Sequence, residues 1–318
     1  MSDTQSLSNL AMGAVRAAEA AAIAAYDWIG RGEKESADQA AVDALRTGLN
    51  AMAMQGRIVI GEGERDEAPM LFIGEEVGSG VGPAIDIALD PLEGTTLTAK
   101  NMPNALAVLS LSPRGGLLHA PDTYMDKIAV GPGLPAGVVD IDAKPEENVI
   151  NLAKAKGVSP SEITVCVLER ERHQYIIDGV KSAGARVRMI SDGDVAGAMG
   201  VSGLGTQVDM YIGQGGAPEG VLAASALRCI GGQMQARLFF RNDDERARAA
   251  RVGVTDLDRK YDLTELASME CLFVATGVTS GDLVEGVSRT ASHVTTETLL
   301  LDSSDKSVRR IRTTSPIG

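Results

Sequence analysis

The chain has 318 residues, which is enough to bury a large core as one domain or as two closely joined halves. Its formal net charge of −13 argues against nucleic acid or an anionic membrane as the main partner, although a bound metal can still attract an anionic substrate. Aromatic residues are scarce, and the 36 glycines suit tight turns and close backbone approaches rather than aromatic stacking surfaces.

The N-terminal segment predicts neither a signal peptide nor a membrane span. Residues 1–5 are polar and lack a basic stretch ahead of an apolar core. The alanine-rich segment that follows carries Arg16, Glu19 and Asp27, which are charges that a membrane span excludes. We therefore expect a cytoplasmic protein.

The first half of the chain predicts two helices followed by three strands. Apolar residues recur at helical spacing on either side of a basic, glycine-bracketed turn at 30–34. The helices are expected at 7–28 and from 36 or 37 to about 54, and the strands at 57–60, 86–90 and 105–111. Glycine, proline and aspartate become frequent around 131–145, so we place the boundary between the halves 1–140 and 141–318 there.

The second half alternates strands and helices. Buried strands are expected at 163–167 and 186–190, further strands at 208–212 and 271–276, and a long apolar helix at 218–229 with proline in its first turn. The polar segment 241–251 is interpreted as a solvated helix or loop. This rhythm predicts α/β layers with functional loops at the strand ends.

The most informative stretch is 90–96, directly after the alternating run 85–89, where a strand is expected to stop. Asp90, Glu93, Gly94, Thr95 and Thr96 place two carboxylates, a glycine and two hydroxyls within seven residues. Hard divalent cations prefer carboxylate oxygens, and a helix that begins at Thr95 offers free backbone N–H groups to a phosphate. The stretch therefore predicts phosphoester chemistry that uses a metal.

Further acids end predicted strands or begin predicted helices. Glu62, Asp192, Asp194 and Glu219 do so, and Asp38 lies early in the second helix. If the strand ends share one edge of a sheet, these acids converge on one cleft. Acids near helix N-termini also stabilise the helix dipole, and for Glu219 or Asp38 taken alone that structural role is the stronger interpretation.

Three other features leave two interpretations each. The turn 192–194 does not fit a calcium-binding EF-hand, so it either presents acids to sugar hydroxyls or is a surface turn. The charged run 170–173 either clamps a phosphate or is solvated, and Tyr124 either packs in the core or contacts a ligand. The chain has no serine nucleophile elbow, no nucleotide phosphate loop and no histidines at zinc spacing.

The motif Asp90-Pro91-x-Glu93-Gly94-Thr95 resembles the metal-binding signature of the lithium-sensitive superfamily of inositol monophosphatases and fructose-1,6-bisphosphatases. More distant segments resemble the class II, bacterial-type fructose-1,6-bisphosphatases in the order of that family's motifs. These segments are Trp28–Gly32, Ile60–Glu64, Glu67–Met70, Asp192–Asp194, Gly215–Gly220 and Thr276–Leu283. The resemblance covers nearly the whole chain.

The resemblance implies a role for each matching residue. The metal ligands, for Mg²⁺ or Mn²⁺, would be Asp38, Glu62, Asp90, Glu93 and Glu219. The scissile phosphate would be held by Glu93, Gly94 and Thr95, with the threonine helping to activate the attacking water and Lys34 adding a basic group near the metal. Contacts to the sugar bisphosphate would come from Tyr124, Arg170, Glu171, Arg172, Asp192, Gly193, Asp194 and Gly216. Arg170 departs from the family, in which a lysine stands at this position. The resemblance therefore implies the substrate affinity less directly than it implies the reaction chemistry.

The expected protein is thus a metal-dependent hydrolase that converts fructose 1,6-bisphosphate to fructose 6-phosphate and phosphate in gluconeogenesis. The resemblance implies a layered α-β-α-β-α sandwich of the sugar phosphatase type, with the metal site in the first half and the sugar and distal-phosphate contacts in the second. It also implies a homodimer or homotetramer. The alternatives are preferential or dual action on sedoheptulose 1,7-bisphosphate, and a non-catalytic sugar-phosphate sensor on the same scaffold.

Overall fold

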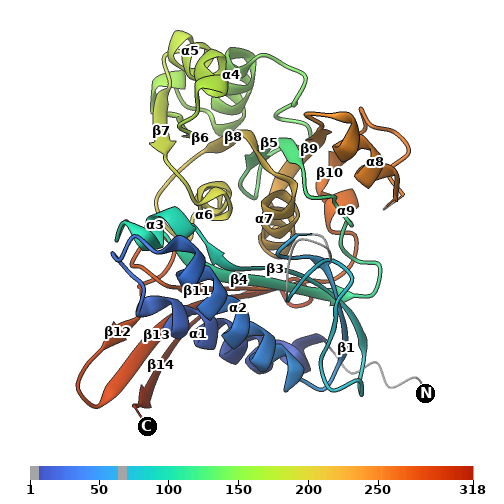
Figure 1. Cartoon of the computed structure of the whole chain (residues 1–318). Helices are drawn as coiled ribbons and strands as arrows, with labels where there is room; N and C mark the ends of the chain where they lie inside the picture. The colour runs from blue at the N-terminus through green and yellow to red at the C-terminus, as the bar shows by residue number, and fades with distance from the viewer. Residues whose placement is uncertain (1–6, 64–69, 252, 318) are drawn as a thin grey trace.

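The chain folds into two β-sheets and three layers of helices (Figure 1), in a computed structural model that describes residues 7–63, 70–251 and 253–317. Within those residues the first sheet has eight strands in the order β12-β13-β11-β4-β3-β1-β2, with β14 paired to β13. Its strands are β1 Gln55–Ile60, β2 Glu76–Val77, β3 Ala84–Glu93, β4 Leu106–Pro113, β11 Leu272–Gly277, β12 Ser288–Arg289, β13 His293–Asp302 and β14 Ser307–Pro316.

The second sheet has six strands among the described residues, in the order β10-β9-β5-β8-β6-β7. They are β5 Tyr124–Val130, β6 Thr164–Leu168, β7 Arg186–Ile190, β8 Met210–Gly216, β9 Gln233–Phe239 and β10 Lys260–Asp262. The boundary at residue 140 stays a prediction about the sequence. The two sheets do not follow it, since β5 joins the second sheet and β11 to β14 return to the first.

Helices cover both outer faces and fill the space between the sheets. α1 Ala11–Tyr26 and α2 Lys34–Asn50 pack on the outer face of the first sheet, where their apolar sides meet β3, β4 and β11. α4 Pro145–Lys156 and α5 Gln174–Ser182 cover the outer face of the second sheet. α6 Asp194–Met199 and α7 Ala217–Ile230 lie between the sheets, so the layered α-β-α-β-α prediction is confirmed.

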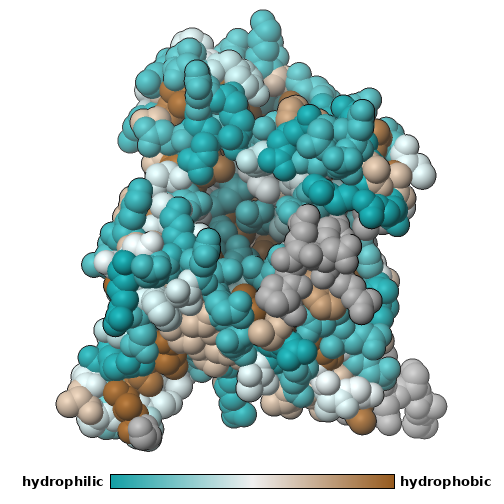
Figure 2. Space-filling view, viewed as in Figure 1, coloured by the Kyte–Doolittle hydropathy of each residue, from teal (hydrophilic) through white to brown (hydrophobic). Residues whose placement is uncertain are grey.

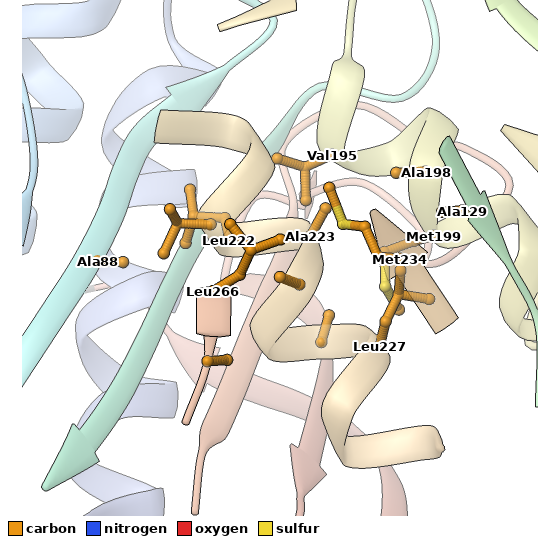
Figure 3. Packing of buried hydrophobic residues seen from close by; sticks show 14 of the residues in the cluster. Ala88, Ala129, Val195, Ala198, Met199, Leu222, Ala223, Leu227, Met234 and Leu266 are labelled. Carbon is orange, nitrogen blue, oxygen red and sulfur yellow. The ribbon is translucent and has the colours of Figure 1, made fainter. Parts of the chain in front are cut away.

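The middle layer explains the apolar composition of α7. Leu222 and Ala223 face Ala88 of β3 and Leu266 of α9 Leu263–Leu266, while Leu227 lies beside Met234 of β9 (Figure 3). A helix that is apolar on all sides is one that is buried on all sides. α7 therefore joins the two sheets into one core.

Several predicted elements shift at their boundaries. The first helix is preceded by a 3₁₀ turn at Leu7–Leu10, the second begins at Lys34 and ends at Asn50, and β8 runs from Met210 through the glycines to Gly216. The strand predicted at 186–190 is present as β7, but its predicted burial is wrong, because β7 is the last strand of its sheet and is partly exposed. The polar segment after residue 241 forms α8 Asp243–Arg251.

The strand predicted to stop at Asp90 continues to Glu93 through a bulge. The pairing of β3 with β4 shifts register between Asp90 and Glu93. Pro91 has no N–H to donate to the ladder, and an irregularity of this kind redirects side chains at the end of a strand. The bulge places both acids at the rim of the first sheet that faces α7.

Within the described residues, no helix is long and apolar enough to cross a membrane.

Candidate active site

A cavity of about 460 Å³ lies between the two sheets, where β3, α2, β5 and α7 end or begin, and Figure 2 shows the surface hollowed between the sheets, with hydrophilic walls. Its lining includes ten residues predicted from the sequence. They are Asp38, Glu62, Asp90, Glu93, Gly94, Thr95, Tyr124, Asp192, Gly216 and Glu219. Residues 64–69, which include Glu64 and most of the Glu67–Met70 segment, lie outside the described residues.

The β3 bulge supplies two of the acids. Asp90 Oδ1 accepts a hydrogen bond from the N–H of Leu92 at 3.0 Å, which fixes the carboxylate in a tight turn. Glu93 is buried, and its Oε1 accepts the N–H of Val195 at 2.7 Å. Loss of water around them raises the pKa of both carboxyls well above the usual range, and the charges of neighbouring acids raise it further.

Three more acids approach from other elements. Asp38 comes from α2, Glu62 follows β1, and Glu219 lies in the first turn of α7. Burial, then the charge of Asp38 and a hydrogen bond with it, raises the pKa of Glu62 to about 8. Burial also raises the pKa values of Asp38 and Glu219, although the positive charge of Lys127 partly offsets the shift at Glu219. The five acids thus repel one another in a poorly hydrated space.

The donor set fits a hard divalent cation. All five groups offer carboxylate oxygens, which Mg²⁺ and Mn²⁺ prefer and which zinc does not favour. Among the described residues, no three His, Cys, Asp or Glu side chains are close enough together to hold an ion as they stand. The same crowding adds to the effect of burial, which is the main cause of the raised pKa values of these acids.

The phosphate-binding element is shorter than expected. Gly94 has φ 90°, a conformation that glycine adopts without strain, and α3 Thr95–Ala99 is little more than one turn. Thr95 lines the cavity, and Lys34 Nζ donates to Thr96 Oγ1 at 2.8 Å. The lysine therefore lies beside the Gly94–Thr95 turn.

Two arginines flank Tyr124. The Arg172 guanidinium lies 5.0 Å and that of Arg241 4.7 Å from the centre of the tyrosine ring. Arg241 lines the cavity and was missed from the sequence, because it lies in a charged run that was interpreted as solvated. Buried Glu245 holds it by accepting a hydrogen bond from Arg241 Nε at 2.6 Å.

The remaining predicted sugar contacts divide into two groups. Asp192 lines the cavity, and Gly193, with φ 83°, follows it as the N-cap of α6. Arg170, Glu171, Arg172, Gly193 and Asp194 do not line the cavity. Arg170 instead donates to the carbonyls of Glu169 at 2.9 Å and Ser191 at 2.8 Å, which ties its loop to the one that carries Asp192.

Asp194 is buried and does not line the cavity. One carboxylate oxygen pairs with Lys127 Nζ, and the other accepts a hydrogen bond from the hydroxyl of Tyr211. The Asp122–Thr123 pair lines the cavity and was not predicted as part of the site. No local pattern distinguishes these residues, since their place follows from the pairing of β5 with β8 and β9.

Fold and cavity together define a class: layered α/β enzymes whose active site is a carboxylate-lined cavity between two sheets. Within that class, residues 8–315 match the family described as bacterial fructose-1,6-bisphosphatase, glpX-encoded. The chain belongs to this family, the class 2 fructose-1,6-bisphosphatases.

Two relatives support the assignment. The chain is 45% identical over 311 residues to fructose-1,6-bisphosphatase 1 class 2 of Escherichia coli K12, covering 93% of this chain and 92% of that protein. The same values hold for fructose-1,6-bisphosphatase class 2 of Shigella flexneri. A solved inositol monophosphatase from Anabaena sp. PCC 7120 shares 14% identity and a TM-score of 0.32, over 61% of this chain and 71% of that one.

Proposed function

We propose that this chain hydrolyses fructose 1,6-bisphosphate to fructose 6-phosphate and phosphate, as the names of its relatives state for them. One observation carries the proposal: five acids from four segments of distant sequence, which are α2, the turn after β1, β3 and α7, line one cavity with Gly94 and Thr95. A phosphate monoester is extremely resistant to uncatalysed hydrolysis. Clustered carboxylates allow a protein to hold cations next to the phosphate, where they promote its hydrolysis.

The metal ligands in this proposal are Asp38, Glu62, Asp90, Glu93 and Glu219, and the ions are Mg²⁺ or Mn²⁺. When bound, such ions neutralise phosphoryl charge and make the attacking water more acidic. The chain's own part is to hold the ester in place. Gly94 lets the phosphate approach the backbone, the first N–H groups of α3 have no partner within the helix, and the Thr95 hydroxyl orients the attacking water.

The sugar and the distal phosphate bind on the side of the second sheet. Asp192, Tyr124 and Gly216 line that wall and contact the sugar. The distal phosphate is bound by Arg172 and Arg241, which flank Tyr124, with Arg170 placing the Asp192 loop. Glu171, Gly193 and Asp194 complete the predicted sugar-binding set, and Lys34 completes the catalytic one. Arginine suits a phosphate because its planar fork donates two parallel hydrogen bonds.

The two alternatives receive no support from the comparisons. Every predicted metal ligand is present as an acid, whereas a sensor built on this scaffold would lack one or more of them. Preferential action on sedoheptulose 1,7-bisphosphate is a distinct substrate choice, and the matched relatives are named for the fructose ester.

The decisive experiment measures phosphate release by the purified protein. Fructose 1,6-bisphosphate, sedoheptulose 1,7-bisphosphate and inositol 1-phosphate are compared after treatment with EDTA and again after addition of Mg²⁺ or Mn²⁺. We expect fructose 1,6-bisphosphate to be the best substrate, with no turnover in EDTA. Absence of phosphate release from it with either ion refutes the proposed function.

We also propose that the enzyme works in the cytoplasm as a homodimer or homotetramer. A typical member of the family is expected to be oligomeric. Light scattering coupled to gel filtration measures the mass of the assembly against the 33.1 kDa chain. A monomer at micromolar concentration would contradict the oligomeric proposal.

A further inference from the structure

A buried lysine lies behind the acid-lined cavity, on the side of the second sheet. Lys127 is in the middle of β5, and its side chain is 1% exposed. Its Nζ contacts the Asp194 carboxylate and donates to the carbonyl of Gly216 at 2.9 Å. An ammonium group is costly to bury, so a lysine kept in such a place must be matched by partners that hold it.

Each partner of Lys127 lies next to a group that holds or carries a predicted metal ligand. Asp194 is the first residue of α6, and the N–H of the following residue, Val195, donates to Glu93 Oε1. Gly216 is the N-cap of α7, whose first turn carries Glu219. One ammonium group thus connects the helix that holds Glu93 with the helix that carries Glu219.

Two glycines, Gly215 of β8 and Gly220 of α7, lie close to this lysine and its neighbours. A Cβ at Gly215 would overlap the Asp194 carboxylate and lie 3.0 Å from Lys127 Nζ. A Cβ at Gly220 would overlap Met125 Sδ and lie 3.2 Å from Lys127 Cδ. The absence of a side chain at both positions therefore leaves room for Asp194 and Met125 and for the lysine that lies beside them.

We propose that Lys127 is a positioning residue: by holding Asp194 and the Gly216 carbonyl, it fixes the starts of α6 and α7 and thereby sets the positions of Glu93 and Glu219. The inference rests on the proposed function, in which both glutamates bind the metal.

The test compares K127M with the wild-type protein by calorimetric titration with Mn²⁺ alone, in the absence of substrate. Methionine keeps the length of the side chain and removes the charge. If Lys127 acted only by its charge, its removal would tighten Mn²⁺ binding, because a cation near the site repels another cation. If it positions the acids, Mn²⁺ binding weakens by about tenfold or more, the range found when groups supporting a metal ligand are lost.

The matched control is K154M, which changes an exposed lysine on α4 and should leave Mn²⁺ affinity unchanged. Circular dichroism at the titration temperature confirms that each variant is folded. Tighter or unchanged Mn²⁺ binding by folded K127M overturns the inference, even if the variant melts at a lower temperature, because a purely structural role lowers stability without changing the affinity of the folded site.

A second variant tests the proposed positioning of the acids if K127M does not fold. Y211F leaves Lys127 in place and removes only the hydroxyl that donates to Asp194. Loss of one hydrogen bond should weaken Mn²⁺ binding by about threefold, and unchanged affinity overturns the inference. Wild-type hydrolysis of fructose 1,6-bisphosphate tests the proposed function separately, so an active wild type with unaffected variants refutes the role of Lys127 alone.

Discussion

The backbone N–H of Val195 donates a hydrogen bond to Glu93 Oε1 at 2.7 Å, across 102 positions of sequence. Glu93 ends β3 in the first sheet, and Val195 lies in α6, which packs against β6 and β8 of the second. A ligand carboxylate supported by a backbone donor from the other layer has its orientation set by both sheets. The cavity is therefore a property of the assembled fold.

Replacing Glu93 by glutamine removes the negative charge and keeps the shape of the side chain. The amide oxygen of E93Q still accepts the Val195 N–H, so the protein should fold as before. One negative charge is lost from the metal site, and we expect kcat to fall about 100-fold or more, because stabilisation of the phosphoryl charge by metal is worth several kcal/mol.

Phosphate release at saturating Mg²⁺ measures the effect of E93Q, and circular dichroism checks the fold. E76Q serves as the control, since Glu76 is exposed on β2 and should tolerate the same change. A kcat of E93Q close to that of the wild type would exclude Glu93 from the metal site.

Asp90→Asn should abolish turnover and at the same time stabilise the metal-free protein. The pKa of Asp90 lies well above its usual range because of burial and then the charges of Glu62 and Glu219, so an uncharged amide relieves repulsion. Active sites often hold such unfavourable charges at a cost in stability. The melting temperature in EDTA at about pH 8 should rise, since Asp90 is then most strongly driven towards its charged form.

The control for this variant is D43N, because Asp43 is exposed on α2 and does not line the cavity. It should change neither activity nor melting temperature by much. Near wild-type turnover by D90N would remove Asp90 from the metal ligands, and a lower melting temperature would show that its carboxylate is stabilising.

The free energy of unfolding of the metal-free protein should fall as the pH rises. The pKa of Glu62 is raised from 4.5 to about 8, so between these values the folded protein keeps a proton that the unfolded chain releases. The free energy of unfolding therefore decreases with pH across that window. Carboxyls whose pKa is lowered, such as Asp142 at about 2, titrate below it and do not reverse the trend.

Added Mg²⁺ should reverse this dependence, because cations bind the deprotonated acids and stabilise the folded state. Melting temperatures measured at about pH 5 and about pH 8, each with EDTA and with Mg²⁺, test both statements. E62Q should flatten the slope measured in EDTA. A metal-free protein that melts at a higher temperature at the higher pH would contradict the crowding of acids in the cavity.

The sequence predicted the parts of the site that depend on local pattern. Asp90, Glu93 and Gly94 follow a run with strand periodicity, and the layered fold follows from the alternation of elements. The bulge that carries β3 on to Glu93 was missed, because Pro91 resembles the end of a strand until the pairing with β4 is known.

Other features depend on partners that are distant in sequence. β5 carries Asp126 and Lys127 in its centre, which a buried strand ordinarily avoids, and Lys127 is tolerated because Asp194 arrives from 67 positions away. The edge position of β7 follows from the strand order, which periodicity does not encode. The polar β14 was missed because it pairs only with β13 and remains largely exposed.

Arg241 should prove to be a substrate-binding residue. Its guanidinium lies 4.7 Å from the Tyr124 ring centre and lines the cavity, held by Glu245. R241A should raise KM for fructose 1,6-bisphosphate about tenfold with a smaller effect on kcat, the size expected for one charged hydrogen bond to a phosphate. The control is R246A, an exposed arginine near Phe240 that does not line the cavity. Equal KM values for both variants would assign the distal phosphate elsewhere.

Gly216 is small because Glu219 occupies the space of its side chain. A Cβ at Gly216 would overlap the Glu219 carboxylate, whereas the nearest atom to a Cβ at Gly213 of the same strand would be in the His173 ring, at 3.2 Å. G216A should therefore displace the glutamate and weaken Mn²⁺ binding by about tenfold or more, with kcat falling in parallel. G213A is the matched control and should retain Mn²⁺ affinity. Calorimetric titration with Mn²⁺ and phosphate release decide between them, because equal affinities for the two variants would mean that Glu219 does not hold the metal from this position.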